Sequence, residues 1–593
     1  MRMILPRMAA LLAVSSLSAP AFAQDIFAPA ATAVSAPAPS TSAMVNLVRA
    51  LVAKGTLSPT EGQALLGQAE AEAARAQAAT ASAPPPGTVR VPYVPESVRA
   101  QIRDELKEDV LQTAKAEGWA QPGKVQDWVG KIKLYGDFRY RSEFQYYGRG
   151  NANNIFDFAV INASGPTELN PNITSFAPPF LNTTRDRNNR QSIRLRFGLL
   201  ADINDKVSLD VRLATGDNAS PVSTNSTLGG GFAKKNIWVD RAAVTLRPLQ
   251  EIALTGGRMA NPFTDTATTV YDDLLWDPDV NFDGVVAAVG SGDRFGEAFT
   301  LRAVGGAFPL EFGSANFPTA GTNKARAVNK WLYAAQLVGN YQFRHDIGIK
   351  ASAAYYHFDG VQGRPSDPCQ TYISGTECTT DPFRPAFLQK GNTVFLLRNI
   401  IGPPGIFNFS QRQFVGLTFD YRLIDLKTDM TVKLDEHKQV TVGGDYVKNL
   451  AFRRGDTCKA YPGGDPTLSA FRGPLNNLSD SAPACAAAGD NAGFQGGDTA
   501  WQAKVQVGWP SIRHFGEWNV IGGYKYIESD SMLDGLTDSD FHLGGTNAKG
   551  YFLAGTMGLF DGVAARARYL SANEVSGAPL AIDVLQLDLM VAF

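Results

Sequence analysis

The chain lacks a bias of charge and lacks long apolar runs. Its 593 residues carry 55 lysines and arginines against 57 aspartates and glutamates, and charged residues make up 19% of the whole. This balance argues against a nucleic-acid partner and against wholesale disorder. No run reaches 18 apolar residues, which argues against a membrane protein built from helices.

Residues that carry chemistry are scarce as well. The five histidines are scattered, and the chain contains no H-E-x-x-H, G-x-S-x-G, P-loop or Cys-x-x-Cys motif. A barrel hydrolase would need a serine and a histidine close together on one face. His357, in an expected strand, is the one mild candidate, and a polar position in a lumen explains it more simply. We therefore expect no catalytic residue, no metal site and no cofactor.

The N-terminus predicts export. Arg2 and Arg7 precede an apolar run, and Ala21-Phe22-Ala23 is a small-x-small cleavage site, so residues 1–23 form a signal peptide. Export places the four cysteines in an oxidising compartment. They fall into two pairs that are close in sequence, which predicts two loop disulfides, Cys369–Cys378 and Cys458–Cys485.

The next hundred residues differ in composition from the rest. Residues 24–43 are rich in Ala, Pro and Ser, typical of a flexible linker. Residues 44–130 show helical periodicity interrupted by a Pro-rich joint at 84–95, and predict a periplasmic helical extension. Two interpretations of its helices remain open. They form a solvated spacer, or a small module that oligomerises or contacts the envelope.

The C-terminal strand decides the fold class. From 581 to Phe593, Leu585, Leu587, Leu589 and Val591 alternate with more polar residues. Because successive side chains of a strand point to opposite faces, this ribbon has one apolar and one mixed face. About 9–11 such residues cross a membrane in a barrel. An aromatic final residue resembles the C-terminal assembly signal of bacterial outer-membrane barrels, which implies the barrel assembly machinery as a partner.

The same alternation recurs from residue 131 onward, and charged residues occupy one face of many segments. Such strands cannot lie in a dry sandwich without burying charge, whereas a barrel with a wet lumen accommodates them. We predict an all-β, 16-stranded antiparallel transmembrane barrel over residues 131–593. The expected strands lie near 131–146, 191–199, 207–213, 236–247, 251–259, 281–290, 298–307, 330–343, 347–358, 413–434, 438–449, 499–509, 514–528, 548–560, 562–570 and 581–593.

The segment 413–434 is the least regular strand. Its apolar phase slips between Leu423 and Ile424, so it is one long bulged strand or two. The connections favour an even count, because every second one is short, as at 204–206 and 561–562, and the others are mostly long, as at 147–190 and 359–412. Short turns on one rim and long loops on the other are typical of outer-membrane barrels.

Three stretches carry a family resemblance. Residues 255–263 (TGGRMANPF), 274–279 (LLWDPD) and 538–550 (DSDFHLGGTNAKG), together with the helix pair around 51–55 (LVAKG), resemble the "putative porin" family of proteobacterial outer-membrane proteins. The likeness extends from about residue 44 to the end. It implies a barrel in the outer membrane of a Gram-negative bacterium, in contact with outer-membrane lipid. The family type and the helical extension also suggest a homotrimer.

Charged residues indicate where selectivity would arise. The polar faces of the expected strands carry a candidate basic wall: Arg139, Arg141, Arg194, Arg196, Arg212, Arg566 and Arg568. The third outside loop carries five acids: Asp265, Asp272, Asp273, Asp277 and Asp279. General porins fold their third loop into the barrel, and the resemblance implies the same constriction here. Alternatively, the arginines pair with Asp137, Glu143 and Asp210 while the loop stays at the rim.

The sequence thus predicts a porin that passes small hydrophilic solutes and ions by passive diffusion, with selectivity set by lumen charge and bore. The alternative is a structural or adhesive anchor that displays the helical module and the disulfide-stapled loops. A TonB-dependent transporter fits less well, because it needs a larger plug domain and usually 22 strands.

Overall fold

The chain forms two compact units, residues Met1–Ala120 and Gln121–Phe593. The computed structural model describes residues 60, 63–68, 71, 129–163, 179–263, 272–292, 294–296, 298–313, 328–370, 373, 378–400, 413–458, 473–479 and 493–593. In the first unit every described residue is helical. The expected signal peptide, the linker and most of the helical extension lie outside the described residues. None of the described helices is both long and apolar enough to cross a membrane.

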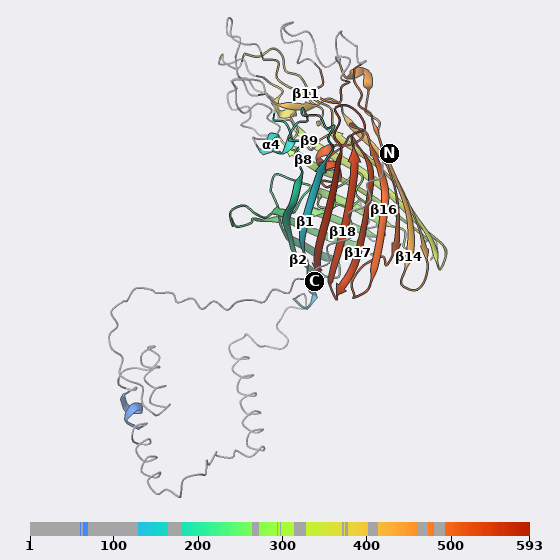
Figure 1. Ribbon diagram of the computed structural model, residues 1–593. Coiled ribbons are helices and arrows are strands. Elements are labelled where there is room, and N and C mark those ends of the chain that lie inside the picture. Colours follow the sequence, from blue (N-terminus) through green and yellow to red (C-terminus); the bar gives the residue numbers. More distant parts are fainter. Residues whose placement is uncertain are drawn as a thin grey trace. The chain divides into compact units, whose positions relative to one another are not determined.

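The second unit is a closed antiparallel barrel, as predicted (Figure 1). Sixteen strands form its wall within the described part of the chain: β1 (Ile132–Tyr147), β2 (Arg187–Asn204), β3 (Val207–Thr215), β5 (Ile237–Leu249), β6 (Ile252–Ala260), β7 (Asn281–Gly290), β8 (Phe299–Phe312), β9 (Asn329–Arg344), β10 (Ile347–Asp359), β13 (Tyr421–Lys433), β14 (Gln439–Asn449), β15 (Thr499–Gly508), β16 (Trp518–Ile527), β17 (Ala548–Phe560), β18 (Val563–Asn573) and β19 (Ile582–Ala592). The first and last strands pair over Asp137↔Ala592 to Tyr147↔Ile582, so the sheet has no free edge.

Short elements accompany the wall among the described residues. They are the strands β4 (Ser226–Thr227), β11 (Val394–Leu396) and β12 (Val415–Leu417), the helix α4 (Phe158–Ala163), and the 3₁₀ turns η1 (Val129–Lys131), η2 (Asp381–Phe383), η3 (Arg454–Asp456), η5 (Asp534–Leu536) and η6 (Phe541–Leu543). The turns β2–β3, β5–β6, β9–β10 and β17–β18 contain two residues each, and they lie at the end of the barrel where the chain terminates (Figure 1).

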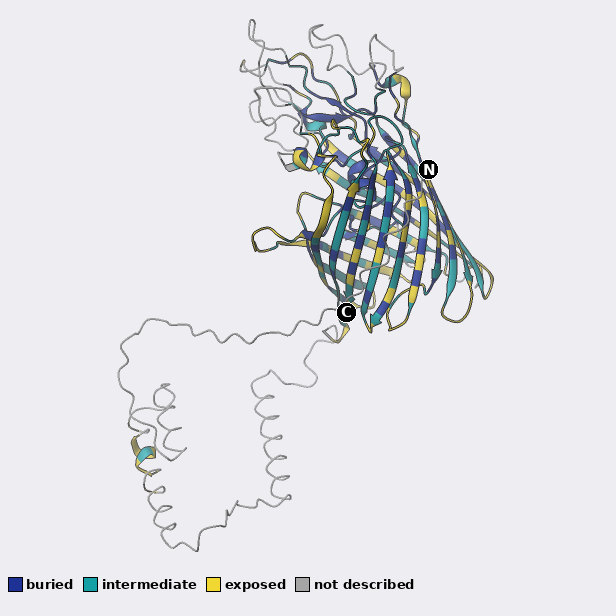
Figure 2. Ribbon diagram, in the orientation of Figure 1, coloured by how far each residue is buried: buried dark blue, intermediate teal, exposed yellow. Residues whose placement is uncertain are grey.

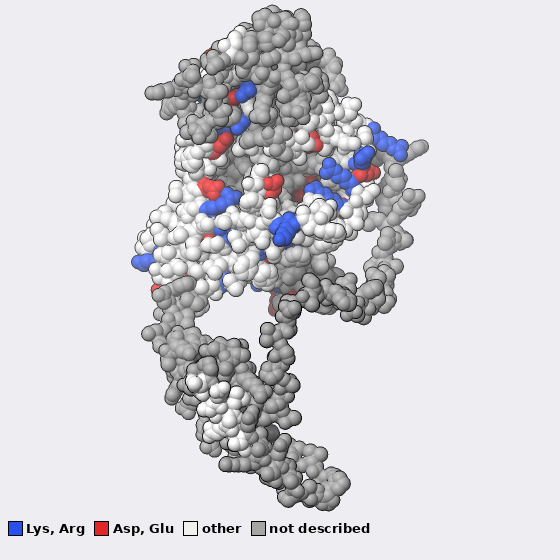
Figure 3. All heavy atoms as spheres, turned by 90° about the vertical axis from the view of Figure 1, so that its left-hand side faces the viewer, with Lys and Arg blue, Asp and Glu red and all other residues white. Residues whose placement is uncertain are grey.

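Burial alternates along the strands in the expected period of two (Figure 2). On β19, Leu587 and Leu589 point outward and are 45% and 42% exposed, whereas Gln586 and Asp588 point inward and are buried. The exposed face is therefore the apolar one, the reverse of a water-soluble sheet. Uncharged residues cover most of the described barrel surface that is seen in Figure 3.

The irregular segment 413–434 contains one barrel strand. Val415–Leu417 belongs to β12, which pairs with β11 outside the wall, and β13 begins at Tyr421. The register of β13 with β10 and β14 shows no bulge. The apolar phase slips because Tyr421 and Leu423 point inward and pack in the core, whereas Ile424 begins the outward apolar row.

Strand β16 is shorter than expected, because it begins at Trp518 and not at residue 514. A turn precedes it, in which the Glu517 carboxylate accepts hydrogen bonds from the backbone N–H groups of Arg513 and His514. Gly516, with φ of +81°, supplies the left-handed conformation that this turn requires.

The main hydrophobic core lies where a loop packs against the inner face of the wall. Leu274, Leu275 and Trp276, from the loop between β6 and β7, are 1–2% exposed. The Trp276 ring lies 4.9 Å from that of Phe282 on β7 and 5.4 Å from that of Tyr356 on β10. This apolar packing holds the described part of the loop, residues 272–280, against β7 and β10.

One expected disulfide is confirmed. Cys369 and Cys378 are bonded in the long segment between β10 and β13, with Cα atoms 5.3 Å apart. Cys458 is also disulfide-bonded, and its expected partner, Cys485, lies outside the described residues.

Candidate functional site: the charged lumen and its infolded loops

Several inward arginines lie at a similar height along the barrel axis, because the register between neighbouring strands pairs them with each other or with a shared acid. Arg139 on β1 lies opposite Arg194 on β2, and Arg141 on β1 lies opposite Asp588 on β19. Asp588 in turn lies opposite Arg566 on β18. The seven arginines of the candidate basic wall thus lie on β18, β1, β2 and β3, four of the five consecutive strands from β18 to β3, and β19 between β18 and β1 carries Asp588.

Arg194 and Arg196 are bound by two carboxylates from opposite sides. Asp137 on β1 lies 2.8 Å from Arg194 Nη2 and 2.7 Å from Arg196 Nε. Asp279, from the β6–β7 loop, lies 3.2 Å from Arg196 Nη1 and 3.7 Å from Arg194 Nη1. Asp279 also accepts hydrogen bonds from the backbone and hydroxyl of Thr224, at 3.0 and 2.8 Å. The side chains of both arginines are at most 17% exposed.

The Asp279 carboxylate is therefore held in its charged form. Burial would raise its pKa, but Arg194 and Arg196 outweigh burial and hold that pKa at about 2. Arg194 and Arg196 thus bind the strand acid Asp137, as one sequence interpretation expects, and Asp279 of the infolded loop, as the other expects.

A second cluster joins β1, β18 and β19 to another loop. Arg141 Nε donates to Asp588 at 2.7 Å, and its Nη1 donates to Asp540 at 2.9 Å. Arg566 lies 2.8 Å from Asp588, and Arg568 lies 3.0 Å from Asp540. Asp540 belongs to the loop between β16 and β17 (528–547), so this loop also reaches the wall.

The remaining two arginines differ from each other. Arg212 Nε donates to the Asp240 carboxylate. Arg139 has no carboxylate partner among the described residues. Its Nη2 donates to the amide oxygen of Asn225 at 2.6 Å, and its Nε is buried without an acceptor.

Two other loop acids meet lysines of the wall. Asp272 lies 2.7 Å from Lys427 on β13, and Asp273 lies 2.8 Å from Lys525 on β16 and 3.6 Å from Arg568 on β18. The side chains of Asp273 and Lys525 are 3% and 1% exposed. Asp265 lies outside the described residues.

Asp277 has no cation partner in the described part of the chain and joins the two infolded loops instead. Its carboxylate accepts the backbone N–H of Asp279 at 2.8 Å and of Ser539 at 2.9 Å, and its own N–H donates to Leu536 O at 2.9 Å. Burial, with the nearby carboxylates of Asp279 and Asp538, raises its pKa well above the usual range. The stretches 274–279 and 538–550, far apart in sequence, therefore meet inside the barrel.

Sequence reasoning missed several members of this network. Asp538 and Asp540 have an i, i+2 spacing and stand within a conspicuous stretch, but a loop carries no periodicity that would aim them at the wall. Lys427 and Lys525 could have been found, because each alternates with the outward apolar residues of its strand.

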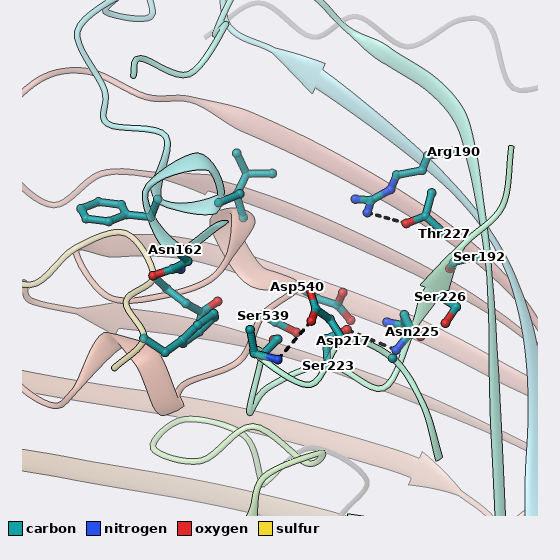
Figure 4. Close-up of a pocket in the computed structure, with 18 of the residues that line it drawn as sticks. Asn162, Arg190, Ser192, Asp217, Ser223, Asn225, Ser226, Thr227, Ser539 and Asp540 are labelled. Carbon is teal, nitrogen blue, oxygen red and sulfur yellow. Dashed lines mark hydrogen bonds between the residues drawn. The ribbon is translucent and has the colours of Figure 1, made fainter. Parts of the chain in front are cut away.

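A large cavity remains beside the wall at the long-loop end. A cavity of about 840 Å³ lies between β1, β2 and the loops. Figure 4 shows Ser192, Asn225, Ser226 and Thr227 lining one side, with Arg190 donating to the Thr227 hydroxyl at 2.8 Å, and Asn162 and Asp540 on the other. Its lining is mostly hydroxyl, amide and charged side chains, which suits hydrated polar solutes.

Comparison with known families establishes which family the chain belongs to. Residues 41–593 match the family described as "Putative porin", which is more than nine-tenths of the chain. The chain belongs to the "putative porin" family. A comparison with curated proteins finds no match. The family membership agrees with the resemblance inferred from 255–263, 274–279 and 538–550.

Solved structures of barrels resemble this chain at very low identity. OprB of Pseudomonas putida is 8% identical, with a TM-score of 0.39, covering 79% of this chain and 96% of its own. The outer membrane channel DcaP of Acinetobacter baumannii is 9% identical, with a TM-score of 0.35, covering 78% and 97%. OmpF of Salmonella typhi, in complex with daunomycin, has the same four values.

The histidine singled out in the sequence lies on the outer face, so the interpretation of a lumen position was wrong. The outward row of β10 carries His357, whose ring stacks on that of Tyr333 with centroids 6.3 Å apart. Its cross-strand neighbours are Tyr333 and Arg422. Neither is a serine, so these neighbours do not supply the pair that a barrel hydrolase needs.

Proposed function

We propose that this chain is a porin of the outer membrane of a Gram-negative bacterium, which passes small hydrophilic solutes and ions passively. One observation carries the proposal. A closed barrel with an apolar outer face encloses a charged lumen wall beside a polar cavity of about 840 Å³. Such a lumen selects by charge and width and needs no chemistry.

The proposed orientation follows from the connections. The short turns and the chain end would face the periplasm, together with the helical extension of 44–130, and the long loops would face the outside. The loop 261–280 would narrow the lumen, because Asp272, Asp273 and Asp279 reach three different parts of the wall. Insertion would depend on the barrel assembly machinery, and the family type suggests a homotrimer.

Single-channel recording in a planar bilayer tests the proposal. The mature chain, shown to be folded by its heat-modifiable migration, should give discrete steps of conductance, and liposomes containing it should swell in small neutral sugars. Folded protein that inserts without conductance steps would contradict the porin function.

The same recording tests the alternative of a structural or adhesive anchor. This alternative has one observation in its favour, because the loops 272–280 and 528–547 both occupy the lumen. Proteolytic cleavage within the described loop 528–547 should then create conductance in a silent barrel. In a porin, the same cleavage should only change the size of existing steps.

A further inference from the structure

Arg139 is the exception in the basic wall. Each of the other six arginines has a carboxylate partner within 4 Å, whereas Arg139 has none among the described residues. It is 6% exposed, and within the described ranges its one hydrogen bond joins Nη2 to Asn225 Oδ1. Its Nε has no acceptor.

This isolation is physically unusual. A guanidinium stays charged at any physiological pH, and a buried charge without a counterion costs several kcal/mol. The neighbours make the position more positive, because Arg141 shares β1 with Arg139 and Arg194 lies opposite it. Their charges are already matched by Asp588, Asp540, Asp137 and Asp279, so Arg139 contributes one unmatched positive charge at this level of the lumen.

The polar cavity reaches Asn225, the residue that is hydrogen-bonded to Arg139. Asn225, which accepts the Arg139 hydrogen bond, lines that cavity together with Ser192 (Figure 4). Arg141 lines it as well. Four further cations line the same cavity and have no carboxylate partner among the described residues: Arg187, Arg190, Lys234 and Lys235. Four acids line the cavity as well. Asp540 binds two arginines, and Glu143 accepts the amides of Gln145 and Gln586. Asp157 and Asp217 accept backbone N–H groups of the residues that follow them.

We propose that Arg139 and Asn225 form a subsite for the anionic oxygens of a small permeating solute, a carboxylate or a phosphate. The proposal rests on the porin function and names the class of solute. A carboxylate or phosphate oxygen would displace the Asn225 oxygen from Nη2 and receive a charge-assisted bond. Rotation of the Asn225 amide would present its NH₂ group as a second donor.

The test uses the mature porin in planar bilayers with potassium chloride, to which potassium acetate or inorganic phosphate is added. The concentration of added anion that halves the chloride current measures its binding. Arg139→Gln should raise that concentration about 10- to 100-fold, because a hydrogen bond to a charged group contributes ~1.5–3 kcal/mol. Acetate and phosphate, added separately, distinguish carboxylate from phosphate recognition.

Two further variants make the experiment decisive. Asn225→Asp places a carboxylate beside Arg139 without removing the arginine, so it should also weaken the block while leaving the barrel at least as stable. Arg302→Gln is the matched control. Like Arg139, Arg302 lies on the inward face of its strand, which is β8. It is exposed and has no ion pair among the described residues. Its loss should leave the block unchanged.

The outcomes separate this proposal from the proposed function. Conductance steps with equal block in the wild type, Arg139→Gln and Asn225→Asp would overturn the subsite and leave the porin standing. Absence of conductance in the folded wild type would overturn the porin. Equal loss of block in Arg139→Gln and Arg302→Gln would show a diffuse field effect, and would likewise overturn the subsite.

Discussion

Gly136 and Phe593 exchange both of their backbone hydrogen bonds and so complete the closing seam. Gly136 N donates to Phe593 O at 2.9 Å, and Phe593 N donates to Gly136 O at 3.1 Å. A Cβ at residue 136 would lie 2.6 Å from the Phe593 ring and 2.5 Å from Arg196 O. The final aromatic residue thus lies over a glycine of the first strand, and this explains why that strand carries a glycine there.

The seam predicts that Gly136→Ala weakens the barrel, because the methyl group displaces Phe593 or the backbone of β2. We expect a loss of about 1–3 kcal/mol in the free energy of unfolding. Deletion of Phe593 should impair insertion further. Heat-modifiable, membrane-inserted protein is the measurement. Gly256→Ala is the control, because its Cβ would meet Val285 at an ordinary 3.8 Å. Equal insertion of all the variants would contradict the prediction.

The paired state of Arg194 and Arg196 changes what their removal should do. From the sequence alone, as water-facing side chains, they would be replaced at little cost to stability. In the structure, the double substitution to Gln leaves Asp137 and Asp279 without a cation, which should cost about 3–5 kcal/mol and release the β6–β7 loop. Denaturant unfolding measures the cost.

The matched control for that variant also converts Asp137 and Asp279 to Asn. It removes two positive and two negative charges together, so most of the lost stability should return. Reversal potentials across a salt gradient should move toward cations in the double variant and return toward the wild type in the control. Unchanged stability in the double variant would show that these ion pairs do not hold the loop.

His542 predicts an acid-sensitive contact between loops. Its Nε2 lies 2.6 Å from Leu580 O, which can only accept, so Nδ1 is left to accept from Lys390 Nζ at 2.7 Å. Burial and Lys390 lower the pKa of His542 well below its ordinary value. A protonated ring would face an ammonium, so the contact loses stability as the pH falls below about 6.5.

Two neighbouring groups, Lys390 and Asp534, change the stability with pH in opposite directions. Burial lowers the pKa of Lys390 to about 7, so its contribution also grows as the pH rises above 7. Asp534 faces Lys390 as well, and burial raises its pKa to about 7, so its contribution declines as the pH rises toward 7. Glu574 also faces Lys390.

A comparison with His542→Gln isolates the histidine, because glutamine keeps a donor and an acceptor but gains no proton. Hydrogen exchange of residues 539–545, corrected for intrinsic rates, should accelerate between pH 6.5 and 5 in the wild type by up to about tenfold per pH unit more than in the variant. The same pH dependence in both proteins would refute the role of His542.

The Cys369–Cys378 bridge predicts local order in the long segment between β10 and β13. Replacing both cysteines with serine should cost about 3 kcal/mol or less, because the closed loop is short. Limited proteolysis between residues 360 and 400 measures the effect, with unreduced wild-type protein as the reference. Thiol labelling of denatured, unreduced protein should leave Cys369 and Cys378 unmodified.

The wall was predictable from the sequence because it follows a period of two. The alternation of apolar and polar residues located all sixteen strands. The slip of the apolar phase at Leu423 also has a structural cause, because the apolar residues before it pack inside against the docked loops and those after it face outward. His357 was misplaced because a polar side chain on a strand suggests the lumen, although its stacking on Tyr333 satisfies it outside.

The ion pairs were not predictable in the same way. Arg141 and Asp588 are 447 positions apart in the sequence, and only closure of the barrel makes them neighbours. Asp277 resembled the other loop acids in sequence, but loops have no periodicity that indicates direction. Its role in joining two loops depends on backbone donors, whose positions no residue type reveals.

The loop of residues 272–280 also has a mechanical consequence. It is fastened to β13 through Asp272 and Lys427, to β16 through Asp273 and Lys525, and to β2 through Asp279 and Arg196. A barrel whose strands are hydrogen-bonded only to their neighbours can flatten without breaking a bond. Ion pairs that connect distant strands through the loop oppose this flattening. Lateral pressure from a bilayer should therefore leave the lumen round, and the width of the lumen should not vary with the lipid.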